Sequence, residues 1–276
     1  MGKHGILGKI GPHIVLLLLS AVFITPLLWM LSTALKTNRQ IFVFPPEIIP
    51  NPVIWENFVD IFFYAPFHIY FQNTVFIVVL NVIGATFSSA MVAYGFARLR
   101  APGREILFIL VLSTMMLPYM VWMIPLYVVF VRLGWINTFY PLIVPAFFGN
   151  PLFIFLLRQF LLGIPTELED AAKIDGCSYI GIFTRIMLPL IKPALTTVAL
   201  FTFMNTWNDF LGPILYLQTP NNYTLAVGLQ VFLTQHTADW ALLMAASSLV
   251  IAPVIVVFFF AQKQFIKGIV LTGIKI

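Results

Sequence analysis

The segment Thr166-Glu-Leu-Glu-Asp-Ala-Ala-Lys-Ile-Asp-Gly176 is the polar centre of an otherwise apolar chain. With its flanks it forms a stretch over residues 164–189, which we call the polar loop. Four acidic residues fall within ten positions here, although charged residues make up only 9% of the protein: Glu167, Glu169, Asp170 and Asp175. Long apolar runs lie on both sides, so we expect the polar loop to face water, where another molecule can contact it.

The composition around this loop is typical of an integral membrane protein. Hydrophobic residues make up 61% of the 276 residues, against about 45–50% in a soluble domain, and the mean hydropathy is +0.98. The apolar runs are continuous rather than alternating, which favours spanning helices over a β-barrel. The predicted fold class is therefore all-α integral membrane. The single cysteine, Cys177, excludes an intramolecular disulfide and a multi-cysteine metal site.

Six membrane spans are predicted within one transmembrane domain over residues 1–276, because each spanning helix needs about 20 mostly apolar residues. The spans lie at about 12–35, 73–96, 106–131, 138–162, 193–217 and 240–262. We expect kinks at Pro118 and Pro125 in the third span and a distortion at Asn150-Pro151 in the fourth. A cleaved signal peptide is the alternative for the first run, but that run is long and no small-x-small site follows it.

The placement of positive charge predicts the orientation of these spans. Of the 15 Lys and Arg residues, three fall on one side of the six-span topology and the other 12 on the side of both termini. The three are Lys36, Arg39 and Arg132. Since Lys and Arg concentrate in cytoplasmic segments, both termini and the polar loop are predicted to be cytoplasmic.

The first half of the polar loop is predicted to be a short capped helix. Thr166 and Glu169 have the spacing of a capping box, in which each side chain bonds the backbone of the other residue. Gly176 is expected to end the helix in the left-handed conformation. Small and apolar side chains share one face that another protein can approach closely: Leu168, Ala171 and Ala172.

The second half is predicted to be an amphipathic helix from Ser178 to Leu188-Pro189. Its apolar stripe has helical spacing: Tyr179, Ile182, Phe183 and Ile186. A connector resting on lipid headgroups is the alternative interpretation. A helix of that kind usually carries Lys and Arg on its polar face, whereas the first helix here is net acidic, which favours a basic protein partner.

The spacing Asp170-Ala-Ala, three residues, Gly176, nine residues, Ile186-x-Leu188-Pro189 resembles the EAA loop of binding-protein-dependent ABC importer permeases. Asp170 stands where that motif has glutamate, with Glu169 beside it. Further segments resemble the carbohydrate-uptake branch, and within it the maltose-type second permease subunit: Asn73-Thr, Tyr94-Gly-Phe-Ala-Arg98, Met116-Leu-Pro118, Pro125-Leu-Tyr127, Leu157-Arg-Gln-Phe160, Phe201-Thr-Phe and Trp207-Asn-Asp-Phe210.

The resemblance implies a type I ABC importer permease, in which a cytoplasmic helix–Gly–helix loop docks on an ATPase. The residues expected to couple to the ATPase are Glu169, Asp170, Ala171, Ala172, Asp175, Gly176, Leu188 and Pro189. The implied partners are a second permease subunit in a heterodimer, two cytoplasmic ATPase subunits and an extracytoplasmic solute-binding protein. The implied location is the cytoplasmic (inner) membrane of a prokaryote, among membrane lipids and without nucleic acid.

No catalytic residue, cofactor or metal is assigned to this chain. A phosphate-binding glycine loop ending in GK[ST] is absent from the sequence, so ATP and Mg are expected to bind the partner ATPases. The four histidines show no ligand spacing. The chain is therefore predicted not to be an enzyme.

Polar residues inside predicted spans are the candidates for a solute path, because they usually face a cavity or a partner. The fifth span supplies Asn205, Trp207, Asn208 and Asp209, and the second supplies Asn73 and Asn81, with Asn150 a fainter candidate in the fourth. An indole beside amides and a carboxylate suits a sugar, since the ring stacks on C–H faces while polar groups bond hydroxyls. Hydrogen bonding between packed helices is the alternative role.

Two other functions need residues that the sequence lacks. A secondary transporter driven by an ion gradient needs its own coupling-ion site at mid-membrane, and Asp209 has no paired intramembrane charge. A membrane enzyme needs a cluster of catalytic polar residues at one interface, and the sequence shows none.

The two adjacent acids of the polar loop are predicted to differ in role, because they point about 100° apart around a helix. Glu169 has the spacing of the cap, which leaves Asp170 to pair with a basic residue of the ATPase. On this basis Glu169→Gln is expected to be mild, since glutamine also serves in a capping box.

Overall fold

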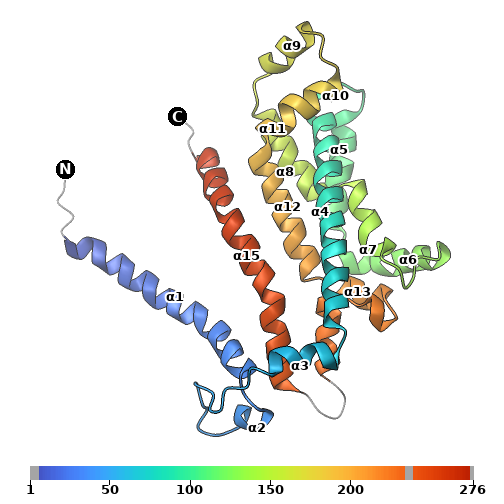
Figure 1. Cartoon of the computed structure of the whole chain (residues 1–276). Helices are drawn as coiled ribbons and strands as arrows, with labels where there is room; N and C mark the ends of the chain where they lie inside the picture. Colours follow the sequence, from blue (N-terminus) through green and yellow to red (C-terminus); the bar gives the residue numbers. More distant parts are fainter. Residues whose placement is uncertain (1–5, 234–238, 274–276) are drawn as a thin grey trace. The chain divides into compact units, whose positions relative to one another are not determined.

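Proline and polar residues divide the apolar runs of the chain into separate helices (Figure 1). The structure is a computed structural model that describes residues 6–233 and 239–273. Every regular element in those residues is a helix. The chain forms two compact units: Met1–Phe67 with Gly228–Pro253, and His68–Val227 with Val254–Ile276.

The first unit contains α1 (Ile6–Ala34), α2 (Asn38–Ile41), α3 (Asn57–Tyr64) and the first part of α15 (Trp240–Gly273). The side chains of residues 11–26 on α1 are all exposed within this chain, as in a helix covered by lipid or by another subunit. The link after α1 is held by Asn57, whose amide donates to the carbonyls of Ala34 at 2.8 Å and Lys36 at 2.9 Å.

The second unit is built on α4, one continuous helix from Phe67 to Arg98. Besides the last part of α15, this unit contains α5 (Arg104–Ser113), α6 (Tyr119–Arg132), α7 (Tyr140–Ile143), α8 (Pro151–Leu162), α9 (Glu167–Ile174), α10 (Tyr179–Ile182), α11 (Leu188–Leu190), α12 (Lys192–Trp207) and α13 (Leu211–Tyr216). The polar loop, with α9 and α10, lies at one end of α4, α8 and α12 (Figure 1).

Among the described residues, four helices are long and apolar enough to cross a membrane: Gly11–Ala34, Phe67–Arg98, Tyr140–Leu162 and Trp240–Gln262. Two bent pairs raise the number to six if each pair is one span: Arg104–Met116 with Tyr119–Arg132, bent by 98°, and Tyr179–Leu190 with Lys192–Trp207, bent by 80°. The all-helical membrane fold is confirmed, while the count of six spans stays a prediction.

The breaks inside the predicted spans follow their polar and proline residues. Leu117 is extended before Pro118 (φ −85°, ψ 116°), because the proline ring disfavours a helical residue before it, and this produces the 98° bend. By contrast, α6 continues through Pro125. Gly149 (φ 84°) and Asn150 separate the last turn before α8 from α8 itself, as expected.

The predicted span at 193–217 is not one helix. It is divided between α12, which ends at Trp207, and α13, which begins at Leu211. Proline lacks the N–H that a helix interior needs but is tolerated in a first turn. A helix that restarts at Leu211 places Pro213 in such a turn, and the Asp209 carboxylate accepts a hydrogen bond from the Gly212 N–H at 3.1 Å.

The polar loop is joined to the helices by an apolar core. Small residues of α4 leave room for large side chains of α8, of the second half of the polar loop and of Ile191 shortly after it. All of these core residues are buried: Ala90, Ala93, Ala97, Leu157, Leu161, Ile182, Phe183, Met187 and Ile191. The predicted apolar stripe is thus buried at Ile182 and Phe183, whereas Tyr179 is exposed. A π-helical turn at Phe183–Met187 leads from α10 into α11, so the helix does not end at Pro189 as predicted but includes it.

Candidate functional site

The start of α9 differs from the predicted capping box. Thr166 has a helical backbone (φ −70°, ψ −24°) and its side chain caps no N–H group, whereas a capping residue usually has an extended backbone. The Glu169 side chain turns inward instead of returning to Thr166, and only 5% of the residue is exposed. The role assigned to Glu169 as a cap was therefore wrong.

Glu169 lies beside Arg98, the last residue of α4. The Arg98 Nε atom is 3.4 Å from the Glu169 Oε1 atom, and the two side chains are 4% and 6% exposed. The Arg98 Nη2 atom also donates to the carbonyl oxygens of Leu161 and Ile164 at the end of α8. One arginine thus connects α4, the end of α8 and α9.

Arg98 was not among the predicted site residues. The sequence did offer one signal, the segment Tyr94-Gly-Phe-Ala-Arg98, which places an arginine at the end of a long apolar run. The sequence contained no signal for the partners of Arg98, because they lie far along the chain. The contact to Leu161 alone joins residues 63 positions apart.

Asp170 faces outward, next to the inward-facing Glu169. Its carboxylate accepts a hydrogen bond from Lys173 Nζ at 3.2 Å, and the Asp170 and Lys173 side chains are 66% and 43% exposed. An ion pair this exposed contributes about 0–1 kcal/mol, so a partner can replace Lys173 at little cost. Ala171 and Asp175 are also exposed, whereas Ala172 is buried against the core.

Gly176 adopts the left-handed conformation that its sequence predicts, with φ +77°. A Cβ atom added there would meet no atom within 4 Å, so the backbone angle alone favours glycine. Ser178 then begins α10 by accepting a hydrogen bond from the Gly181 N–H at 3.2 Å. The predicted helix–glycine–helix arrangement is thus confirmed.

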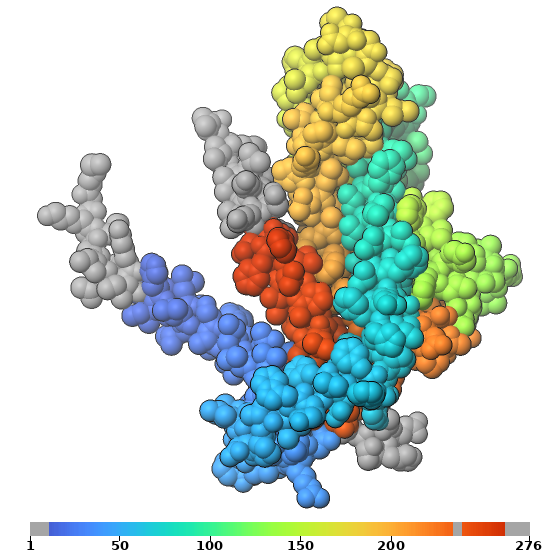
Figure 2. Space-filling model, in the orientation of Figure 1, coloured from blue at the N-terminus to red at the C-terminus, as the bar shows by residue number. Residues whose placement is uncertain are grey.

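The outer side of the polar loop carries apolar side chains that nothing in the described chain covers. Ile174 is 87% exposed and Ile180 is 76% exposed, and both lie close in sequence to Leu168 and Tyr179, which are also exposed. In Figure 2 the polar loop forms a projecting end of the second unit. Large apolar side chains gathered beside acidic ones are typical of a surface that contacts another protein.

A second candidate region is a small polar cavity of about 270 Å³ in the second unit. It brings together three candidate residues from three parts of the chain: Asn81 of α4, Asn150 before α8 and Asn205 of α12. Thr202 and Thr206 line it as well. Within the described residues the side-chain amide of Asn205 has no hydrogen-bond partner, so it is available to a solute.

The other two asparagines of the cavity also serve the fold. The Asn81 amide donates to the carbonyls of Ile77 and Leu142, each at 2.9 Å, and so connects α4 to the turn at Leu142. Asn150 accepts hydrogen bonds from the first N–H groups of α8. Of the three, Asn205 is the residue whose polar group is not used to hold the helices.

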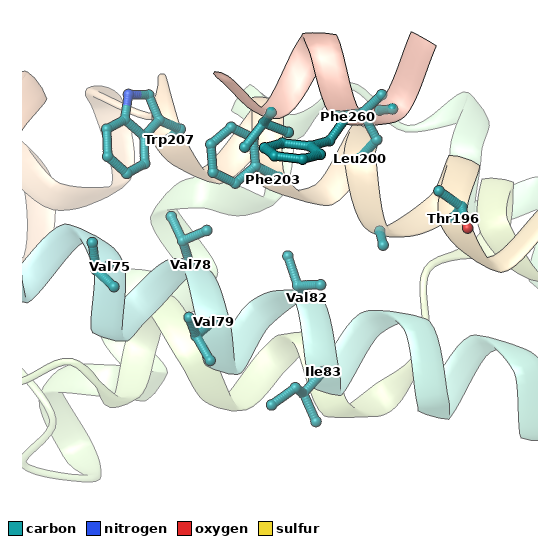
Figure 3. Close-up of a pocket in the computed structure, with 13 residues that line it drawn as sticks. Val75, Val78, Val79, Val82, Ile83, Thr196, Leu200, Phe203, Trp207 and Phe260 are labelled. Atoms are coloured by element: carbon teal, nitrogen blue, oxygen red, sulfur yellow. The ribbon is translucent and has the colours of Figure 1, made fainter. Parts of the chain in front are cut away.

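The remaining candidates of the predicted solute path lie elsewhere. Trp207 is buried and stacks on Phe203 with ring centroids 5.4 Å apart, and it faces an apolar pocket of about 540 Å³ (Figure 3). Asn208 donates to the Met204 carbonyl at 2.8 Å. Asn73 donates to the carbonyls of Asn221 and Tyr223.

The structure therefore divides the predicted cluster of Asn205, Trp207, Asn208 and Asp209. The indole of Trp207 stacks on Phe203 and lines the apolar pocket together with Val75 and Val78 (Figure 3). The break in the helix after Trp207 directs Asn208 and Asp209 to local backbone groups. Asn205 alone remains with the polar cavity.

These features define a class of protein: an all-helical, multi-pass membrane protein with a helix–glycine–helix loop exposed at one end. The chain belongs to the family of binding-protein-dependent transport system inner membrane components, whose family model matches residues 85–270. It is thus a permease subunit of an ABC importer in the inner membrane. The ATPase activity of such importers lies in separate subunits, so this chain is not an enzyme.

Individual relatives agree with this assignment. The arabinooligosaccharides transport system permease protein AraQ of Halalkalibacterium halodurans is 37% identical over 88% of this chain and 86% of its own length. The crystal structure of a bacterial ABC transporter involved in the import of the acidic polysaccharide alginate has a TM-score of 0.81 at 22% identity, covering 96% of this chain and 100% of that one.

A second solved structure shows such a transporter with a partner bound. It is the bacterial alginate ABC transporter in complex with alginate pentasaccharide-bound periplasmic protein, with a TM-score of 0.64, 16% identity and coverage of 93% of this chain and 94% of that one. At 22% and 16% identity, these two solved structures establish the fold of this chain.

Proposed function

We propose that this chain is one of two permease subunits that import a sugar or sugar-like solute. The solute is delivered by an extracytoplasmic binding protein, and two cytoplasmic ATPases that bind ATP and Mg drive the import. One observation carries the proposal: the polar loop presents Asp170 and uncovered apolar side chains outward while its other side is packed into the helices. The name of the relative AraQ, an arabinooligosaccharides transport system permease protein, supports a carbohydrate solute.

The docking surface comprises the outward-facing residues of α9 and α10. Asp170 is the acid that pairs with a cation of the ATPase, and the Gly176 bend sets the angle between the two helices. Ala171, Asp175 and Pro189 are exposed along the same segment and can be covered on docking. Ala172 and Leu188, which pack against the core, act instead by holding the loop in place.

The solute path of this subunit runs through the polar cavity. A sugar hydroxyl needs both donors and acceptors, and the Asn205 amide supplies both beside Thr202 and Thr206. The volume of about 270 Å³ lies just below the range of about 300–1,000 Å³ that is usual for ligand sites. The rest of the site would then come from the second permease subunit.

Reconstitution in proteoliposomes tests the proposed function. This chain, its second permease, the ATPase and the binding protein are expected to take up labelled oligosaccharide only when ATP is supplied on the ATPase side. Uptake by this chain alone on an ion gradient would support the secondary transporter instead and contradict the proposal.

A substitution at Asn205 tests the solute path. Asn205→Leu should raise the solute concentration for half-maximal uptake about tenfold, because it removes an unshared amide from the cavity, and loss of such a contact costs about 1–3 kcal/mol. Asn208→Leu is the matched control, since Asn208 bonds its own helix. Equal effects of the two substitutions on uptake would contradict this placement of the path.

The proposed topology is a single transmembrane domain of six spans with both termini in the cytoplasm. Fusion reporters test it. A reporter fused after Pro102 should report a cytoplasmic position, and a reporter fused near Asn222 should report a position outside the cell membrane. The physical reason is the concentration of Lys and Arg on the side of Pro102. The opposite result at either position would contradict the six-span arrangement.

A further inference from the structure

The polar loop contains one carboxylate that cannot reach a docking partner in this structure. Glu169 is buried on the inner side of α9, and its nearest cation is the equally buried Arg98. Because docking uses the outward-facing acids such as Asp170, the buried Glu169 requires a different role.

Arg98 holds three segments with one planar group. Its Nη2 atom bonds the carbonyls of Leu161 and Ile164, where α8 ends and carries partial negative charge. Its Nε atom faces Glu169 of α9. Lysine cannot make this set of contacts, because it carries a single point charge rather than a planar fork of donors.

The helix that ends at Arg98 also lines the polar cavity. α4 runs without a break from Phe67 to Arg98, which at 1.5 Å per residue is about 48 Å, and Asn81 lies within it on the cavity wall. A displacement of α9 that shifts Arg98 can therefore reach the cavity along a single rigid element.

We propose that Arg98 and Glu169 are positioning residues that transmit movement of the polar loop to α4 and so to the solute cavity. This inference rests on the proposed function. The separation of 3.4 Å between Nε and Oε1 exceeds the 2.7–2.9 Å of a charge-assisted hydrogen bond, and neither atom has a hydrogen-bond partner in the described chain. The contact can therefore tighten when the ATPases move α9.

A purely stabilising role explains this pair less well. A buried ion pair is a poor source of stability, since apolar replacements of similar volume are often neutral or better, whereas loss of one partner leaves an uncompensated buried charge. That asymmetry separates the two roles. Removing both charges should restore stability in either case, but it restores transport only if the pair is merely structural.

The experiment uses the assembled importer in proteoliposomes with labelled oligosaccharide. The variants are Glu169→Gln, Arg98→Gln, Arg98→Lys and the double variant Arg98→Gln with Glu169→Gln. For each, the ATPase retained on purification is measured, and then the ratio of solute imported to ATP hydrolysed. Glu105→Gln is the matched control, because it removes the partner of Arg158 at the same end of the helices without touching the polar loop.

The ratio should fall at least tenfold in Glu169→Gln and in both Arg98 single variants, and it should stay within twofold of the unaltered complex in Glu105→Gln. The double variant should assemble and retain the ATPase while its ratio of solute imported to ATP hydrolysed stays low. If Arg98→Gln alone fails to assemble, the double variant carries the test, because it leaves neither member of the pair charged.

Recovery of the ratio in the double variant, or ratios within twofold of the unaltered complex in the single variants, would overturn the proposal and leave the proposed function intact. The proposed function is tested separately, on the unaltered complex. Uptake there without ATP would contradict it before any variant is measured.

Discussion

Replacing Gly176 with valine is expected to lower ATP-driven uptake at least tenfold while leaving the protein inserted in the membrane. Gly176 has φ +77° and joins α9 to α10. The left-handed conformation costs an L-residue about 1–2 kcal/mol, and it is least accessible to a β-branched residue. Valine should therefore change the angle between the two helices that dock.

Two control variants separate backbone strain in the polar loop from strain elsewhere. Gly176→Asn should retain uptake within about twofold, because asparagine tolerates the left-handed region. Gly103→Val places the same side chain at another glycine with φ +76° and open space around it, outside the polar loop. Uptake by Gly176→Val equal to that by Gly103→Val would show that the bend does not depend on glycine.

Substituting Asp170 with asparagine is expected to weaken ATPase binding by a factor of about 30 to several thousand. This range corresponds to about 2–5 kcal/mol for truncating one member of a charge pair that becomes buried on docking. Loss of the exposed contact to Lys173 cannot produce an effect of this size, since such pairs contribute about 0–1 kcal/mol. The measurement is the amount of ATPase that co-purifies at matched salt concentration.

Glu167→Gln is the control for that measurement. Glu167 is exposed in the first turn of the same helix, so this variant removes an equal charge from the same surface. ATPase retention close to that of the unaltered chain is expected. If the two variants lose the ATPase equally, binding depends on the total charge of the polar loop, and the assignment of Asp170 fails.

The corrected position of Glu169 changes the expectation for that residue. As a cap, glutamate could be replaced by glutamine with little effect. As the buried partner of Arg98, it leaves a buried guanidinium without its counterion when replaced. Glu169→Gln is therefore expected to impair transport, whereas binding of the ATPase should still depend on Asp170.

Local sequence was sufficient wherever a few neighbouring residues decide the conformation. The apolar runs indicated membrane helices, and Pro118 together with Asn150-Pro151 marked breaks in them. Gly176 marked the bend of the polar loop. In each case the physical cause is a backbone preference or a missing N–H group that acts within one helical turn.

Only the tertiary structure decided which polar groups meet. The polar cavity joins Asn81, Asn150 and Asn205 because three helices pack together, while Trp207, only two residues from Asn205, faces apolar neighbours. Glu169 looked like a cap because its spacing from Thr166 was right, but the guanidinium of Arg98 offered a buried carboxylate a counterion that no local backbone group supplies. Such pairings depend on packing between segments more than 60 residues apart, and no local pattern encodes that packing.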